Sequence, residues 1–214
     1  MNREKILQQI EESGVVAVLR LNDSKKLPQI IEALAKGGLK AMEITMTTPN
    51  ALDVIAEASK NLRNEFIVGV GTVLDGETAR MAILAGAEFV VSPVLNIELI
   101  KTVKRYGKIM ISGAFTPTEI VAAWENGADM VKVFPATALG PKYFQDIKGP
   151  LPQIKLTPTG GVSLENTAAF IKSGACCVGV GSALLDKKMI DGNDWEGLAK
   201  LAAMFRAEVE KGRK

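Results

Sequence analysis

Two ionisable residues, Lys132 and Glu43, stand inside segments that are otherwise apolar. Lys132 lies in the run Met-Val-Lys-Val-Phe-Pro, and Glu43 lies in Ala-Met-Glu-Ile-Thr. Burial disfavours the charged form of a lysine, and a neutral amine is a nucleophile toward carbonyl groups. A carboxyl group nearby can transfer protons. The pair therefore predicts covalent amine chemistry on a ketone. The alternative is structural: the two residues form an ion pair, or the lysine reaches solvent from the end of a strand.

Glycine-rich turns and an arginine predict a second part of the site, which binds an anion. The tripeptide Thr-Gly-Gly at 159–161 follows one apolar segment, and Gly181-Ser182 ends another. Backbone N–H groups can approach an anion closely at glycine, and a helix N-terminus adds positive potential. Arg20 ends the first apolar segment, where a guanidinium suits a carboxylate or a phosphate. Ordinary turns and an exposed strand-end charge are the alternatives.

The chain of 214 residues contains no histidine. This excludes a Ser-His-Asp triad, the zinc motif HExxH and any metal site with histidine ligands. The net charge of +2 and the 5% content of aromatic residues argue against nucleic acid or an anionic membrane as a partner. Two adjacent cysteines, Cys176 and Cys177, lack the CxxC spacing of redox and zinc sites, so we expect two small buried residues.

The length of the chain suits one sizeable hydrophobic core, and no linker or low-complexity stretch interrupts it. We therefore expect a single domain over residues 1–214. The first 14 residues are polar, unlike a signal peptide. No run approaches the roughly 18 apolar residues that a membrane span needs. These features predict a cytoplasmic protein.

A weak internal repeat predicts the elements that position these residues. Four segments share a glycine, a short spacer and an apolar run: 37–44, 86–91, 127–134 and 174–180. Four more apolar segments lie between them, at 15–20, 66–71, 108–111 and 154–158. The glycine is typical of a left-handed helix end, and each apolar run is typical of a buried parallel strand. Strands and helices that alternate eight times in this length predict a compact (β/α)8 barrel, a TIM barrel, with an N-terminal helix.

An open doubly wound sheet is the rival architecture. Its dinucleotide-binding fingerprint GxGxxG is missing, because Leu74 stands where the third glycine would follow Gly69 and Gly71. In a barrel the active site lies at the C-terminal ends of the strands. That rule brings Lys132 and Glu43 to the same end of the fold as the glycine-rich turns.

Three helix starts are marked by capping residues. Thr48-Pro49 and Thr116-Pro117 each place a hydroxyl before a proline at the first helical position. Glu119 completes a capping box with Thr116, and Ser163 begins the helix after the 159–161 turn.

Taken in order, these motifs resemble those of one known family, the 2-keto-3-deoxy-6-phosphogluconate (KDPG) and 4-hydroxy-2-oxoglutarate (KHG) aldolases. The similarity extends from Val16 to about Leu185. The stretches that carry it are Val16-Ala17-Val18-Leu19-Arg20, Glu43-Ile44-Thr45, Gly69-Val70-Gly71-Thr72-Val73, Val91-Ser92-Pro93, Val131-Lys132-Val133-Phe134-Pro135 and Pro158-Thr159-Gly160-Gly161-Val162.

The resemblance implies a Schiff-base aldolase without metal or other cofactor, usually a homotrimer, acting on a small 2-keto acid. The implied reaction cleaves a 2-keto-3-deoxy-6-phospho sugar acid to pyruvate and glyceraldehyde 3-phosphate, as in the Entner–Doudoroff pathway. KHG, cleaved to pyruvate and glyoxylate, is a second implied substrate. Lys132 matches the Schiff-base lysine and Glu43 the general acid–base. The implied substrate-binding residues are Arg20, Thr72, Thr159, Gly160, Gly161, Gly181 and Ser182.

One position departs from the pattern of the family. Some members carry a carboxylate-binding arginine four residues beyond the glutamate, where this chain has Thr47. Other members have an arginine at the end of the first strand, and Arg20 matches that version. Two other functions stay open at this point. One is a phosphosugar isomerase or epimerase with a non-covalent Lys132, and the other is a protein that binds a phosphorylated metabolite without catalysis.

Overall fold

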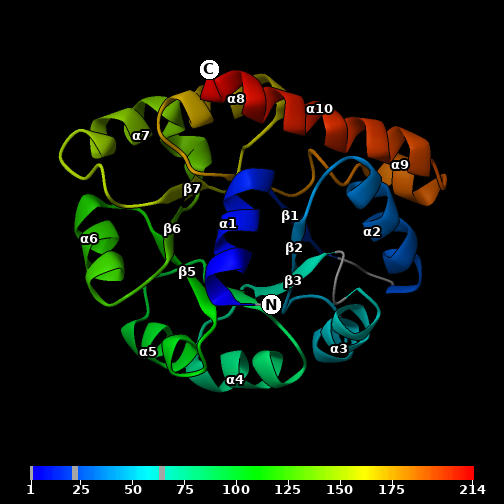
Figure 1. Cartoon of the computed structure of the whole chain (residues 1–214), viewed down its shortest axis with the longest axis horizontal. Coiled ribbons are helices and arrows are strands. Elements are labelled where there is room, and N and C mark those ends of the chain that lie inside the picture. Colours follow the sequence, from blue (N-terminus) through cyan, green and yellow to red (C-terminus); the bar gives the residue numbers. More distant parts are fainter. Residues whose placement is uncertain (1, 21–23, 63–65) are drawn as a thin grey trace.

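Eight parallel strands form a nearly closed barrel in the part of the chain that the structure, a computed structural model, describes: residues 2–20, 24–62 and 66–214. Figure 1 shows the helices arranged in a ring around it. The strands are β1 (Val15–Leu19), β2 (Ala41–Thr45), β3 (Ile67–Gly71), β4 (Phe89–Val91), β5 (Ile109–Ala114), β6 (Met130–Val133), β7 (Leu156–Pro158) and β8 (Val178–Val180). Their order is β7-β6-β5-β4-β3-β2-β1-β8. The predicted TIM barrel is confirmed.

Helices follow the strands along the chain and cover the outer face of the barrel. They are α2 (Leu27–Lys36), α3 (Ala51–Asn61), α4 (Gly76–Leu84), α5 (Ile97–Arg105), α6 (Pro117–Glu125), α7 (Gly140–Lys148), α8 (Leu164–Lys172), α9 (Lys187–Asp191) and α10 (Trp195–Arg213). Short 3-10 turns lie at Ser24–Lys26 and Ala136–Ala138. One further helix, α1 (Arg3–Ser13), precedes β1. In the described residues no helix has the length and apolar character to cross a membrane.

Alternation along the strands divides the apolar side chains into two clusters. The outer cluster lies between strands and helices and includes Val15, Ala17 and Leu19 of β1. The inner cluster fills the N-terminal half of the barrel with side chains such as Val16 and Phe89. Every strand residue is buried, as the continuous apolar runs predicted. The barrel is therefore filled from its N-terminal end, and the C-terminal end is left for other side chains.

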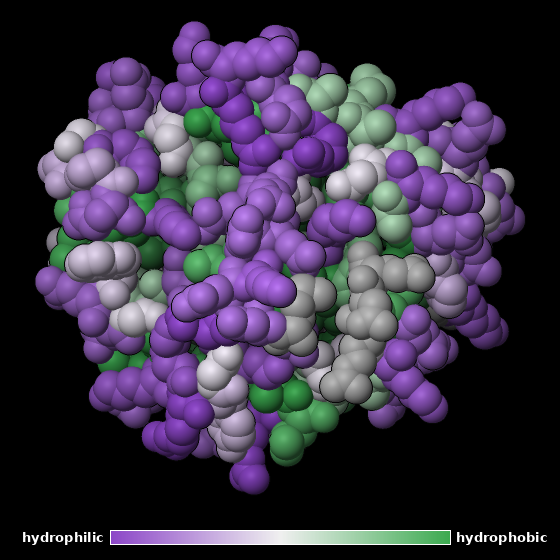
Figure 2. All heavy atoms as spheres, in the orientation of Figure 1, coloured by the Kyte–Doolittle hydropathy of each residue, from purple (hydrophilic) through white to green (hydrophobic). Residues whose placement is uncertain are grey.

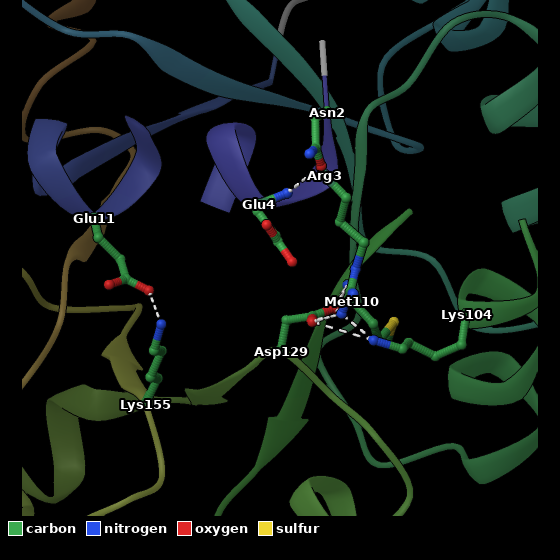
Figure 3. A network of polar contacts seen from close by, with 8 residues as sticks. All are labelled: Asn2, Arg3, Glu4, Glu11, Lys104, Met110, Asp129 and Lys155. Carbon is green, nitrogen blue, oxygen red and sulfur yellow. Dashed lines mark hydrogen bonds and ion pairs between the residues drawn. The ribbon is translucent and has the colours of Figure 1, made fainter. Parts of the chain in front are cut away.

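The N-terminal helix closes the end of the barrel opposite the predicted site. Ile6 and Ile10 of α1 pack into the inner cluster, and Figure 1 shows α1 lying across the middle of the ring. Polar contacts hold this helix in place (Figure 3). The carboxylate of Asp129 accepts hydrogen bonds from Arg3 of α1 and from the Met110 backbone N–H, the latter at 2.9 Å. Further contacts join Lys104 to Asp129, at 3.2 Å, and Lys155 to Glu11. Hydrophilic side chains cover most of this face (Figure 2).

The predicted helix boundaries are confirmed with one exception. Gly38, Gly86, Gly127 and Gly174 have φ of 87°, 113°, 94° and 99° and follow helices, as the repeat predicted. Thr116 and Glu119 form the capping box of α6, and Ser163 is the N-cap of α8. The start predicted at Thr48-Pro49 is wrong: α3 begins at Ala51 after Asn50, which has φ 53°. The Thr48 N–H donates to the Thr45 carbonyl at 2.9 Å, so this segment forms a turn before the helix.

Candidate active site

Lys132 and Glu43 lie on opposite sides of the barrel and on its inner face. Lys132 is on β6 and Glu43 on β2, and three strands separate them along the sheet order in either direction around the ring. Each lies two positions after a residue on the inner face, Met130 or Ala41, so both side chains point into the barrel. The exposed fractions are 4% for Lys132 and 3% for Glu43. An amine and a carboxyl group thus face the same interior space.

The Glu43 carboxyl group is held in an environment that favours its neutral form. Burial raises the pKa of this carboxyl above its usual range, and the positive charges of Lys132 and Arg20 oppose the shift. Its Oε1 atom is buried and has no hydrogen-bond partner among the residues that the structure describes. A carboxyl group that keeps its proton closer to neutral pH is suited to both accepting and donating a proton during a reaction.

Lys132 forms no ion pair with Glu43 in the described part of the chain. Its Nζ atom lies 5.0 Å from the centre of the Phe134 ring instead. The structural alternative, in which these two buried residues simply neutralise each other in contact, is therefore wrong. The side chain of Lys132 therefore points into the barrel interior without an acidic partner among the described residues.

A cavity of about 590 Å³ opens at the C-terminal ends of β1, β7 and β8. Six of the seven predicted substrate-binding residues line it: Arg20, Thr159, Gly160, Gly161, Gly181 and Ser182. Phe134, whose ring faces the Lys132 amine, lines it as well. Lys132 and Glu43 are not among the lining residues, so Phe134 is the part of the lining that contacts the buried amine. A smaller hollow of about 310 Å³ is lined by Ile6, Lys60 and Glu88, among others, and by none of the predicted site residues.

The turn after β7 has the geometry of an anion site. Gly160 and Gly161 have φ of 86° and 74°, a left-handed conformation that glycine adopts readily. A Cβ atom on Gly161 would lie 2.5 Å from Thr137 Oγ1, so a side chain would not fit there. Asn166 Nδ2 donates to the Gly161 carbonyl at 2.8 Å and fixes the turn at the N-terminus of α8. Glycine lets backbone N–H groups approach an anion closely, and the N-terminus of α8 adds positive potential, so the turn suits a phosphate.

Residues at the junction of β7 and β8 form part of the cavity lining. The two strands are joined by isolated bridges, one of which pairs Thr159 with Gly179. A Cβ atom on Gly179 would lie 2.4 Å from Thr159 Oγ1, so the glycine makes room for that hydroxyl group. Gly179 begins the same glycine-containing run as Gly181 and Ser182 but is not among the predicted binding residues. Its position two residues before Gly181 is the sequence signal that could have indicated a shared face of the strand.

Thr72 lies apart from the other predicted binding residues, immediately after β3. It has φ 59°, a conformation that β-branched residues rarely adopt. Backbone strain of this kind is kept mainly where function requires it. Because β3 neighbours β2, Thr72 lies at the same end of the barrel as Glu43. The structure thus brings six predicted binding residues to one cavity and leaves Thr72 outside its lining.

Sequence alone gives Lys26 no role, yet it forms hydrogen bonds to a helix that is distant in the chain. Its Nζ atom donates to the carbonyl groups of Ile190 and Asp191 at 2.8 and 3.2 Å. These carbonyl groups lie at the end of α9, the helix that follows the Ser182 loop. Lys26 thereby ties the N-terminus of α2 to the C-terminal end of α9.

Known proteins resemble this chain over most of its length. A family model described as "KDPG and KHG aldolase" matches residues 6–201. The 2-dehydro-3-deoxy-phosphogluconate aldolase of Haemophilus influenzae is 33% identical over 199 residues, which cover 92% of this chain and 93% of the relative. The KHG/KDPG aldolase of Escherichia coli K12 is 33% identical over 190 residues, 88% of each chain.

A solved structure has a similar fold over most of its length. It is the KDPG aldolase of Legionella pneumophila with pyruvate captured as a covalent carbinolamine intermediate. The TM-score is 0.85 at 27% identity, over 92% of this chain and 96% of that one. Fold, site and relatives together define an aldolase, an enzyme of the aldehyde-lyase class. The chain belongs to the KDPG and KHG aldolase family. The isomerase and binding-protein alternatives are set aside.

Proposed function

We propose that this aldolase works through a Schiff base on Lys132 and cleaves a 2-keto-3-deoxy-6-phospho sugar acid to pyruvate and glyceraldehyde 3-phosphate. The observation that carries the proposal is the buried amine of Lys132, which faces Glu43 across the barrel without pairing with it. The carbinolamine in the Legionella relative supports the same chemistry. The proposed reaction needs only an amine and a carboxyl group from the protein.

The reaction proceeds through an iminium intermediate. The Lys132 amine attacks the C2 ketone, and loss of water gives the iminium. Glu43, through a water molecule, takes the proton of the C4 hydroxyl group, and the C3–C4 bond breaks as its electron pair flows into the iminium. The aldehyde leaves. The remaining enamine takes a proton at C3, and water then hydrolyses the iminium to release pyruvate and the free amine.

The proposed binding roles follow the lining of the cavity, except for Thr72, which lies outside it at the end of β3. Arg20, Thr72 and Thr159 bind the carboxylate and hydroxyl groups of the sugar acid. Gly160 and Gly161, with Gly181 and Ser182 from the neighbouring loop, hold the phosphate. A cavity of about 590 Å³ falls within the range usual for small-molecule sites.

Borohydride trapping with pyruvate tests the proposed function. Reduction of the iminium leaves a stable adduct, and we expect intact-mass analysis and peptide mapping to place it on Lys132. A folded wild-type protein that forms no adduct would refute the Schiff-base mechanism. The ratio of kcat/KM for KDPG and KHG tests the phosphate site separately. We expect a clear preference for KDPG, and a ratio near one would rule out that preference.

Arg20→Leu is expected to raise the KM for the keto acid about 10- to 100-fold, since a hydrogen bond to a charged group contributes roughly 1.5–3 kcal/mol. The value of kcat should change much less, because the carboxylate is bound in ground state and transition state alike. Steady-state kinetics measure both constants. Arg105→Leu, on α5, is the matched control and should leave them unchanged. An unchanged KM in Arg20→Leu would make Arg20 an exposed strand-end charge.

We also propose that the protein is a cytoplasmic homotrimer. Large apolar side chains are exposed on adjacent elements, among them Leu74, Val94 and Phe115 after β3, β4 and β5, and Leu84 on α4, of which 70% is exposed. Exposed apolar side chains on neighbouring elements are typical of an association surface. Sedimentation equilibrium should give three times the 22.9 kDa of one chain. The variant Leu84→Glu should lower that mass, and a monomeric wild type would contradict the proposal.

A further inference from the structure

Gly71, the last residue of β3, lies where the Glu43 side chain leans against the barrel wall. The strands β2 and β3 pair so that Glu43 is opposite Gly69 and Thr45 is opposite Gly71. The Glu43 side chain reaches toward the C-terminal end of the barrel, past its own register partner. A Cβ atom on Gly71 would lie 2.5 Å from Glu43 Oε1 and 2.7 Å from Cδ. The carboxyl group thus occupies the space that a side chain at position 71 would fill.

The backbone does not require glycine at this position. Gly71 is not among the residues with positive φ, so an L-amino acid could adopt its conformation. The three heavy atoms closest to an added Cβ are all atoms of Glu43. Gly69, on the same strand and the same face, differs in this respect, because its added Cβ would meet the Phe89 ring at 2.4 Å. One glycine makes room for core packing, and the other makes room for the carboxyl group.

The charged groups around the space beside Gly71 explain why the position of the Glu43 carboxyl group matters. Lys132 faces Glu43 from β6, and Arg20 faces it from the end of β1. Glu43 forms an ion pair with neither cation in the described residues, and its Oε1 atom has no hydrogen-bond partner. A carboxylate displaced from the wall would move into the interior, toward the opposite positive charges. There it would bind the amine and occupy space that the substrate needs.

We propose that Gly71 is a positioning residue for the aldolase reaction: the missing side chain creates the niche that holds the Glu43 carboxyl group against β3 and apart from the Lys132 amine. The inference rests on the function proposed above, in which these two groups act as separate acid–base and nucleophile. Catalytic groups must be held close to their productive geometry, and a misplacement of about 1 Å can cost about 10²-fold in rate.

The variant Gly71→Ala tests this niche. We expect kcat/KM for KDPG to fall about 10- to 100-fold. The acid limb of the pH profile should also move to lower pH, since a carboxylate pushed toward Lys132 is stabilised in its charged form. Gly69→Ala is the matched control, because its added methyl group meets Phe89 instead. It should lower the melting temperature and leave the acid limb in place. An unmoved acid limb in Gly71→Ala would overturn the inference.

A double-mutant cycle separates a niche for Glu43 from a general packing role. In a Glu43→Ala background the methyl group at position 71 has no carboxyl group to displace, so Gly71→Ala should change the residual kcat/KM less than twofold. An equal loss in both backgrounds would contradict the proposal. If Gly71→Ala does not fold, Glu43→Ala should restore its cooperative unfolding, and failure to do so would also contradict it. Trapping of pyruvate by the wild type is measured first. A wild type that forms no adduct refutes the proposed function itself, and this result is distinct from a failure of the inference about Gly71.

Discussion

Lys132→Met is expected to abolish aldol cleavage, with kcat reduced roughly 10⁴- to 10⁶-fold, as for the loss of a nucleophile in other enzymes that use covalent catalysis. Methionine has a similar length and keeps the packing against Phe134, but it has no amine to attack the ketone. Release of pyruvate from KDPG measures the cleavage. Trapping with borohydride should give no adduct in this variant.

The fold of Lys132→Met should be retained. Only 4% of the Lys132 residue is exposed, and burying a charged group without an ion-pair partner costs stability that a buried methionine does not cost. The melting temperature should therefore equal or exceed that of the wild type. Lys155→Met is the matched control, since Lys155 contacts Glu11 at the opposite end of the barrel. It should leave cleavage intact. Substantial cleavage by Lys132→Met would show that the amine is not the nucleophile.

Glu43→Gln is expected to lower kcat about 10²- to 10⁴-fold, the usual contribution of a general acid–base. Glutamine preserves the shape of the side chain and removes the proton transfer. The Lys132 amine is still present, so pyruvate should still be trapped on it by borohydride. This combination, slow cleavage with retained trapping, distinguishes the acid–base role of Glu43 from the nucleophilic role of Lys132. Loss of trapping to the same degree as cleavage would contradict it.

The same variant should change how stability depends on pH. The raised pKa of Glu43 means that the folded protein holds this proton more tightly than the unfolded chain does. The stabilising contribution is complete below the unfolded pKa and is lost as pH rises through the folded pKa. Glutamine resembles the neutral form, so Glu43→Gln should be more stable than the wild type above the folded pKa. The difference in the free energy of unfolding between the variant and the wild type should become smaller at low pH. Urea unfolding across this range measures it, and parallel curves would refute the expectation.

Local patterns in the sequence were sufficient for the elements of the barrel. The apolar runs predicted all eight strands because a parallel strand covered on both faces needs apolar side chains at every position. Thr116 and Glu119 predicted a helix start because a capping box involves only residues close in the chain. The wrong prediction of a helix start at Thr48-Pro49 also came from a local pattern. The competing bond from Thr48 N–H to the Thr45 carbonyl depends on how β2 ends, and the capping pattern does not include that.

The sequence by itself determined the chemistry available to this protein: one lysine and one glutamate inside apolar strands, glycine-rich turns after two later strands, and no histidine. Only the tertiary structure decided how these groups meet. Closure of the barrel sets β2 opposite β6, so Glu43 faces Lys132 although they are far apart in the chain. Pairing of neighbouring strands places Gly71 beside the Glu43 carboxyl group and Gly179 beside Thr159. These contacts depend on strand register and on the curvature of the closed sheet, which arise from the packing of the whole chain.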